Sequence, residues 1–412
     1  MTMKRIGYAA YMLGISAALL TAGCSNDGDV EGAKSSEPVR IPLTEDTRAL
    51  VDKGNSFGID LLSAVGEEKN GNFVISPFSA FMTAAMLANG DCGLSRDQIM
   101  SAMGLEGTDA DLAILNDYCR SLSSFLPKVD GNVTCSLANG AWADPVEGFL
   151  DTFSGVLSDS FGAECRNISP AGEAGRADIN GWVSGKTSGM IPELLKKPIA
   201  DKTMFAIVNA VYFKGEWQKR FDKAKTGTAI FHNADGSESE HMQMQFSGNA
   251  TMLQTEDYTS VGLKYGNGNF EMVLAVPNEG NGGMLSKERL HQMLSELRYL
   301  TPADVELKMP RFEVESDLDL VGSLKRMGIL APFDTNHGLN NISRITQYLK
   351  IYQQGVKIRV DEEGSVAAAA TIAAGTVISA GKAELTIDRP FIFLVRETTT
   401  GAILFAGRIN SL

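Results

Sequence analysis

The chain has 412 residues, of which 44% are hydrophobic and 21% charged, a composition typical of a globular protein and not of a disordered one. Its 37 basic and 50 acidic residues leave a net charge of −13, and no basic stripe is present, so nucleic acid is excluded as an expected partner. The length allows one large domain or two to three ordinary ones.

The N-terminal residues indicate a lipoprotein signal peptide over residues 1–23. Lys4 and Arg5 precede an apolar run at 9–22, which is short for a membrane span. The run ends in small residues before Cys24, a pattern that resembles the bacterial lipobox, in which the thiol is lipidated. We therefore predict a bacterial cell-envelope lipoprotein of the outer membrane, the cell surface or the extracellular space, and the pattern does not decide between the periplasmic and the outward-facing side. An ordinary cleaved signal peptide is the alternative.

Residues 24–45 are rich in Ser, Gly, Asp, Glu and Pro, which predicts a flexible tether. The remaining cysteines are even in number and have no metal-binding spacing. The sequence therefore does not decide between disulfides and isolated buried thiols for Cys92, Cys119, Cys135 and Cys165.

Helical periodicity dominates the first half of the folded region. Ser76 and Pro77 are typical of a helix start, with the hydroxyl as cap. Helices are expected from residue 46, over 78–87, 109–125 and 145–161, and within 178–195. The first of them contains Gly54-Asn55-Ser56-Phe57-Gly58, formally a G-x-S-x-G motif, but no strand precedes the serine as a catalytic elbow requires.

Strands dominate the second half, after one early strand at 73–75. They are expected at 203–213 and, from residue 228 onward, at 263–265, 271–277, 304–310 and 312–314. Helices that precede and are segregated from large sheets indicate an α+β fold.

One connection between strands is unusual. Strand-like residues at 349–360 and 391–395 flank a long segment that has no charged residue between Glu363 and Lys382. Structureless connections of this length are uncommon in compact domains and are usually functional.

A set of motifs in a fixed order resembles the serpin family over nearly all of residues 46–412. They lie at 72–79, 209–217, 272–277, 309–312, 361–365, 389–393 and 404–408. The resemblance implies the α+β serpin fold, with three β-sheets, eight or nine helices and an exposed reactive-centre loop at about 362–386. It also implies a monomer that a target serine protease cleaves in this loop. The loop then enters the main sheet, and the protease stays bound in a covalent complex.

The hinge that the resemblance assigns permits this entry. It comprises Glu362, Glu363, Gly364, Ser365, Ala367, Ala369 and Thr371. In the family's register the inward side chains are Ser365, Ala367, Ala369 and Thr371, all small and uncharged. Burying a charge there would cost several kcal/mol. We therefore expect an inhibitory protein, with a non-inhibitory surface serpin as the alternative.

The same register assigns the reactive bond to Ile378–Ser379, with Thr376 and Val377 as alternative positions for the cut. No Lys or Arg lies in this window. A trypsin-like protease, whose pocket binds a Lys or Arg side chain, therefore finds no suitable residue in this window. The apolar pockets of elastase-like or subtilisin-like serine proteases can bind the apolar residues that are present. Papain-like cysteine proteases are the second possibility.

The resemblance also assigns a structural gate to Ser76 and Asn209 beneath the main sheet, Trp217 at its top, and Gln354 where the family often has His. We expect no catalytic residue, cofactor or metal. The histidines are scattered, without metal or catalytic spacing, at 232, 241, 291 and 337.

Overall fold

The computed structural model describes residues 37–201, 203–278, 285–365 and 382–412. All of them belong to one unit, 35–412. The predicted signal peptide, Cys24 and most of the predicted tether lie outside the described residues. None of the helices in the described ranges combines the length and the apolar character that crossing a membrane requires.

Eight α-helices occur in the described residues, as the family resemblance implied. They are α1 (Glu45–Glu68), α2 (Pro77–Ala88), α3 (Leu94–Ala102), α4 (Asp109–Phe125), α5 (Asp151–Phe161), α6 (Gly172–Lys186), α7 (Lys287–Glu296) and α8 (Val321–Arg326). Short 3₁₀ turns follow at Lys223–Lys225, Leu297–Tyr299 and Ala331–Phe333. The helices expected at 145–161 and 178–195 were misplaced: α5 begins only at Asp151, and α6 begins at Gly172 and ends at Lys186.

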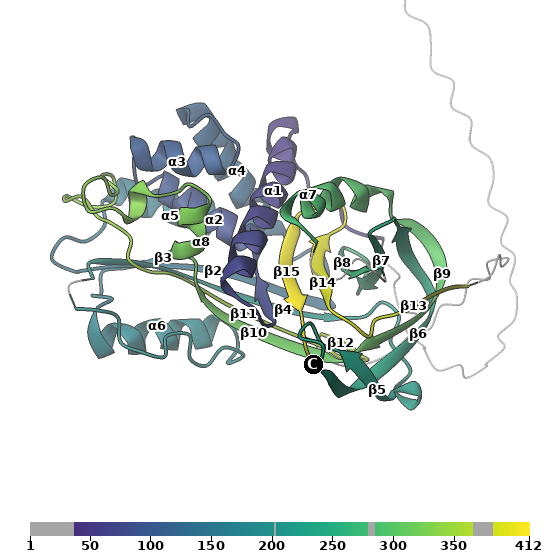
Figure 1. Ribbon diagram of the computed structural model, residues 1–412. Helices are drawn as coiled ribbons and strands as arrows, with labels where there is room; N and C mark the ends of the chain where they lie inside the picture. The colour runs from purple at the N-terminus through teal and green to yellow at the C-terminus, as the bar shows by residue number, and fades with distance from the viewer. Residues whose placement is uncertain (1–36, 202, 279–284, 366–381) are drawn as a thin grey trace, which may run out of the picture. The chain divides into compact units, whose positions relative to one another are not determined.

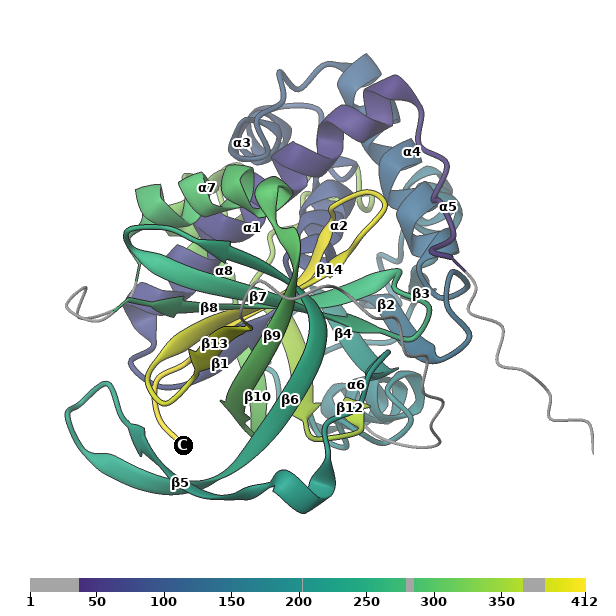
Figure 2. The ribbon, with the colours of Figure 1, turned by 90° about the vertical axis from the view of Figure 1, so that its right-hand side faces the viewer.

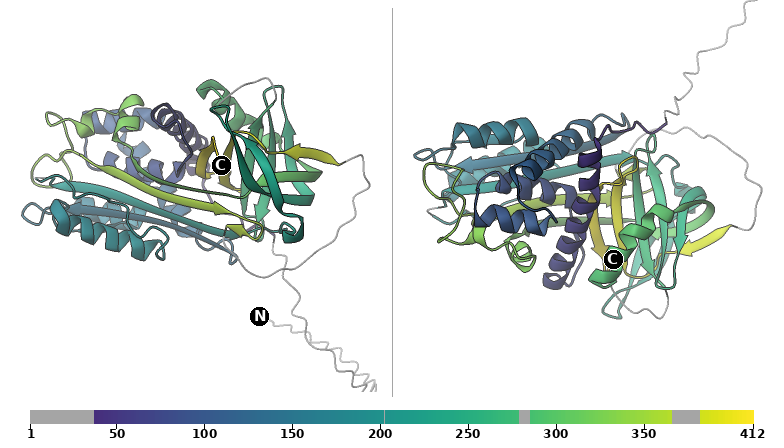
Figure 3. Two further views of the ribbon diagram at one scale, coloured as in Figure 1. Left: turned by 60° about the horizontal axis from the view of Figure 1, so that its bottom comes forward. Right: turned by 90° about the horizontal axis from the view of Figure 1, so that it is seen from above.

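The main sheet has the strand order β10-β11-β4-β2-β3. Its strands are β2 (Val133–Ala143), β3 (Glu164–Arg166), β4 (Phe205–Glu216), β10 (Phe312–Asp319) and β11 (Tyr352–Val360). Helix α6 covers one face, and the other face lies toward α1, α2 and α5 (Figures 1 and 3). Both faces are therefore buried, which explains why the part of β4 from Phe205 to Val211 is apolar apart from Asn209.

The other two groups of strands are joined through one long strand, β6 (Glu238–Gln254). One group is β1 (Phe73–Ile75), β15 (Ile403–Ile409), β14 (Phe391–Glu397), β8 (Phe270–Pro277) and β7 (Tyr258–Tyr265). The second is β5 (Gly227–His232), β6, β9 (Thr301–Pro310) and β13 (Ala383–Thr386). β6 pairs with both β7 and β9 (Figure 2).

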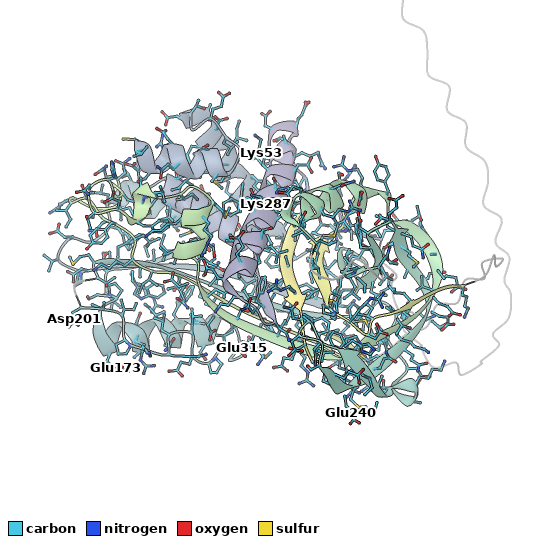
Figure 4. All side chains as sticks on the ribbon, viewed as in Figure 1. Lys53, Glu173, Asp201, Glu240, Lys287 and Glu315 are labelled. Atoms are coloured by element: carbon cyan, nitrogen blue, oxygen red, sulfur yellow. The ribbon has the colours of Figure 1, made fainter. Side chains whose placement is uncertain are left out.

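The apolar side chains form two cores. The larger lies between the helices and the sheets and includes Val211 and Phe213 of β4. The smaller lies beneath α6 and includes Val208 and Ala210 of β4. Residues of β4 therefore alternate between the cores, as a strand with a two-residue period must. Charged side chains such as Glu173 of α6 point outward (Figure 4).

The chain just before α1 is held to the folded body. Asn269 accepts a hydrogen bond from the Val39 N–H at 2.7 Å and donates to the Val39 carbonyl at 2.8 Å. Ile41 is fully buried. The end of the segment that we expected to be a flexible tether thus contacts the turn between β7 and β8.

Candidate functional site

The hinge and the open end of the main sheet form the candidate site. β4 and β11 run parallel and pair from Ile207 with Tyr352 to Tyr212 with Lys357, where the pairing stops. Beyond this point the chain leaves β11, turns at Asp361, and forms the short strand β12 (Gly364–Ser365). β12 pairs antiparallel with Glu216 and Gly215 of β4. The hinge thus adds the first two residues of a new strand to the main sheet.

Glu362 is buried at this turn, with only 3% of its side chain exposed. Its carboxylate accepts hydrogen bonds from Arg311 Nε at 2.9 Å, from Arg311 Nη2, and from the Thr226 hydroxyl at 2.5 Å. Burial by itself would raise the pKa of Glu362. The contacts with Arg311 and Thr226 outweigh burial and lower this pKa, so the carboxylate stays ionised and fixes the start of the hinge.

Trp217, the expected gate residue at the top of the sheet, contacts the same turn. Its indole N–H donates to the Asp361 carbonyl at 2.8 Å, and its backbone N–H donates to the Glu363 carbonyl at 2.9 Å. The indole stacks on Tyr265 with ring centroids 4.3 Å apart. The Glu363 side chain forms an ion pair with Lys223. These contacts hold the turn on the end of β4.

Gly364 has a conformation that a side chain would obstruct. Its φ is +139°, and a Cβ added there would lie 2.2 Å from the Gly215 carbonyl oxygen. The family resemblance assigned this glycine to the hinge without giving a reason for it. The structure gives one, which is the close approach of two backbones.

Two further residues of the predicted gate, Ser76 and Gln354, bind each other. The Ser76 N–H donates to Gln354 Oε1 at 2.9 Å, and Gln354 Nε2 donates to the Ser76 carbonyl at 3.2 Å. The Ser76 hydroxyl donates to the Leu404 carbonyl at 2.7 Å and makes no capping bond to α2, so the predicted hydroxyl cap was wrong. Gln354 therefore supplies both a donor and an acceptor at this gate position.

Asn209, the fourth residue of the predicted gate, lies in a polar row across three strands. It is the pairing partner of Asn139 on β2 and of Gln354 on β11. Asn209 Nδ2 donates to Asn139 Oδ1 at 2.9 Å and to the Ala138 carbonyl at 3.2 Å. Asn209 Oδ1 is buried and has no hydrogen-bond partner within the described ranges. Buried amide oxygens are normally satisfied, so one acceptor is available here.

The rest of the predicted site lies outside the described residues. This applies to the hinge positions Ala367, Ala369 and Thr371, and to the reactive-bond positions Thr376, Val377, Ile378 and Ser379.

The described cysteines are free thiols. Cys92 is exposed, Cys119 and Cys135 are buried, and Cys165 is intermediate. Burial raises the pKa of Cys135 to about 12 and that of Cys165 to about 11. Buried, protonated thiols are weak nucleophiles.

A serine, a histidine and an aspartate meet between α1 and α7. His291 Nε2 lies 2.7 Å from Asp60 Oδ1, and His291 Nδ1 lies 3.5 Å from the Ser56 hydroxyl. Ser56 is the serine of the G-x-S-x-G motif, but it lies within α1, where backbone N–H groups are already used in helical hydrogen bonds. The arrangement therefore has no helical N–H available for an oxyanion hole. No cluster of three potential metal ligands occurs in the part of the chain that the structure describes.

Comparison with known proteins identifies the family. Residues 52–412 match the family model for "Serpin (serine protease inhibitor)". Iripin-8 of Ixodes ricinus is 30% identical over 391 residues, which cover 90% of this chain and 95% of the relative. Leukocyte elastase inhibitor of Equus caballus is 30% identical over 376 residues, which cover 86% of this chain and 97% of the relative.

Solved structures agree with this match. The native stressed conformation of Arabidopsis AtSerpin1 is 26% identical, with a TM-score of 0.78 over 90% of this chain and 99% of that chain. The thermophilic serpin tengpin in its native state has 24% identity and a TM-score of 0.79, over 92% of this chain and 97% of that chain. Because the family model and relatives with 30% identity cover most of its length, the chain belongs to the serpin family.

Proposed function

We propose that the protein is a suicide inhibitor of extracellular endopeptidases that traps its target when the cleaved loop enters the main sheet. The observation that carries the proposal is β12. Gly364 and Ser365 already pair with the end of β4, at the point where β4 and β11 stop pairing with each other. A strand that continues from β12 would enter between these two strands.

The pairing of β12 defines the register of such a strand. Gly364 pairs with Glu216 and Ser365 with Gly215, so each further loop residue moves one residue back along β4. In this register Ala367 would lie opposite Phe213, and Ala369 opposite Val211. Phe213 and Val211 face the larger core, and directly opposed residues face the same side of a sheet. Ala367 and Ala369 would then be buried, and their small side chains fit a packed interior.

The same register places Thr371 opposite Asn209, between β4 and β11. Asn209 Oδ1 is the buried acceptor without a partner in the described residues. A threonine hydroxyl can donate to it, so entry of the loop to this depth would satisfy the unpaired acceptor. The gate would thereby favour the inserted state over the resting state.

The proposed reaction is acyl transfer without release. The serine hydroxyl of the protease attacks the Ile378 carbonyl, the bond to Ser379 breaks, and the Ser379 amine leaves with a proton. The Ile378 carbonyl carbon stays esterified to the protease serine. Loop entry would then move the ester away from the other catalytic groups of the protease before water hydrolyses it. Relatives named as leukocyte elastase inhibitors support an elastase-like target with an apolar pocket.

The proposal is tested by mixing the protein with pancreatic elastase, subtilisin or papain and separating the products on a denaturing gel. A covalent band with elastase or subtilisin is expected, together with a released C-terminal peptide whose mass gives the cut. Cleavage with full residual protease activity would instead identify a non-inhibitory serpin. A complex with papain alone would assign cysteine proteases as the target.

We further propose that Cys24 carries the lipid anchor. The support is the sequence alone: a basic start, an apolar run and small residues before the cysteine. Metabolic labelling with a fatty acid should label the wild type and not Cys24→Ser, and cell fractionation should follow the label. A labelled Cys24→Ser protein would contradict the proposal.

A further inference from the structure

A hollow of about 160 Å³ lies at the junction between the two groups of strands, next to the residues that follow Trp217. Its buried floor is apolar and consists of Phe246, Ala250 and Leu263, and the exposed Pro302 borders it. Its rim is polar and consists of Gln218, Lys219, Asn249, Thr251 and Lys264. The volume far exceeds the ~10–15 Å³ that one water molecule needs, so a small organic molecule fits. An apolar floor with a few convergent polar groups is the usual composition of a ligand site.

The charge on the rim is positive. Lys219 Nζ lies 5.8 Å from the centre of the Phe246 ring, on which it packs. Gly248 makes room for this ammonium group, since a Cβ added there would lie 2.4 Å from Lys219 Nζ. Within the described residues, no carboxylate forms an ion pair with Lys219 or with Lys264. Two positive charges without partners thus border an apolar floor in a chain whose net charge is −13.

Glu271, the strand partner of Lys264 across β7 and β8, has a carboxylate that is already bound. An added Cβ at Gly262, a wall residue, would lie 2.5 Å from Glu271 Oε1. Glu271 accepts hydrogen bonds from Arg396 at 2.7 and 2.9 Å and from the Thr251 hydroxyl at 2.8 Å. Its charge is therefore compensated and does not neutralise the rim.

We propose that this hollow binds a small amphipathic organic anion, an aromatic or branched alkyl group that bears one carboxylate or sulfonate. The apolar part lies on Phe246 and Leu263, and the acid group lies between Lys219 and Lys264. Binding draws the residues after Trp217 against β7, to which Gln218 is already attached by its N–H bond to the Lys264 carbonyl at 2.8 Å. Because Trp217 binds Asp361 and Glu363, the ligand also holds the hinge closed.

The binding step does not depend on the proposed function, whereas its effect on loop entry rests on it. A closed hinge slows insertion and gives the protease time to hydrolyse the ester. The ligand therefore converts part of the inhibitor into a cleaved substrate.

The probe for binding is 8-anilinonaphthalene-1-sulfonate, and its matched control is N-phenyl-1-naphthylamine, which lacks the sulfonate. Each is titrated by fluorescence into the native protein. The variants are Lys219→Glu/Lys264→Glu, with Lys128→Glu as an exposed control remote in sequence. We expect one site for the sulfonate, affinity weakened at least about tenfold in the double variant, and wild-type affinity in the control. Equal binding of the neutral analogue, or unchanged affinity in the double variant, would overturn the site.

The effect on the hinge is measured with elastase in the presence and absence of the sulfonate. The ratio of cleaved inhibitor to covalent complex should rise at saturating probe in the wild type and not in the double variant. An unchanged ratio at saturation would overturn the coupling. If no complex forms even without probe, the proposed function fails, while the titration still decides whether the site exists.

Discussion

Arg311 reaches from the start of β10 to Glu362 at the hinge, and the two side chains differ sharply in exposure. The guanidinium is 42% exposed, whereas the carboxylate that it binds is 3% exposed. Removing the arginine leaves a buried charge with Thr226 as its remaining side-chain donor, whereas replacing the glutamate leaves an arginine that water can solvate. The two halves of this ion pair should therefore not be equivalent.

We predict that Arg311→Ala destabilises the resting protein by about 2 kcal/mol and that Glu362→Gln costs less. Arg359→Ala is the matched control, since Arg359 is 56% exposed and lies 3.7 Å from Asp361, and it should change stability by less than about 0.5 kcal/mol. Urea unfolding midpoints measure all three. Equal losses for Arg311→Ala and Arg359→Ala would show that burial of Glu362 has no energetic consequence.

The same pair predicts a pH dependence. The pKa of Glu362 is lowered from its ordinary value of 4.5, so its ionised form contributes stability in full above that value. This contribution is lost as the pH falls through the lower folded pKa. Unfolding midpoints at pH 7, at pH 5 and in acid should therefore fall more steeply below about pH 4.5 in the wild type than in Glu362→Gln. Parallel curves would contradict the prediction.

Gly364→Ala tests the close approach of β12 to β4. The substitution requires an alanine at a φ of +139° and moves the Gly215 carbonyl, so we expect a loss of about 2–3 kcal/mol. Gly236→Ala is the control, because its φ of +85° is also left-handed but nothing lies within 4 Å of the added Cβ. A smaller loss at Gly364 than at Gly236 would mean that β12 is not tightly held.

Neighbouring loop residues should respond oppositely to a charge. In the proposed register Ala367 faces the larger core, whereas Val366 lies between Lys214 and Arg359 on the other face. Ala367→Glu should abolish the covalent complex with elastase and leave a cleaved substrate, because a buried carboxylate costs several kcal/mol. Val366→Glu should retain inhibition. Gel quantification of complex and cleaved product decides this, and loss of the complex in both variants would exclude the register.

The thiols should react in the order of their exposure. Cys92 is exposed, whereas Cys119 and Cys135 are fully buried with pKa values that burial raises. In native protein 5,5′-dithiobis(2-nitrobenzoate) should label Cys92 first, and Cys119 and Cys135 only after unfolding. Rapid labelling of Cys119 or Cys135 in native protein, identified by peptide mass, would indicate that the body around α4 and β2 opens readily.

Local sequence patterns predicted the apolar strands well. They failed where a residue type is required by a contact that forms only in the folded sheet. The strand expected at 271–277 is β8, whose residues are all buried. β2 escaped notice because Asn139 and Gly140 interrupt its apolar pattern. Asn139 binds Asn209, and a Cβ at Gly140 would lie 2.6 Å from the Trp142 ring. These requirements arise only when the sheet forms.

Helix prediction failed for a related reason. α3 and α7 have only 9 and 10 residues and bury three and two side chains, so each offers few positions from which a helical period can be recognised. Ser76 looked like a helix cap because its neighbours in sequence fit that role. Its hydroxyl instead binds the Leu404 carbonyl, 328 residues away. The family motifs predicted positions for the gate and the hinge, whereas the Glu362 ion pair and the Asn209 oxygen without a partner could be found only in the structure.

The pairing between β4 and β11 has a consequence for the direction of any loop movement. The two strands share a single ladder of six residue pairs, and that ladder must open to admit a strand. An entering strand replaces this one ladder with two, one on each of its sides, and antiparallel pairing is slightly more stable per residue than parallel pairing. Each loop residue that would enter after the β4–β11 ladder has opened thus forms more backbone hydrogen bonds than it breaks. In the proposed mechanism, each step of loop entry from the open end beside Glu216 would therefore be easier to make than to reverse.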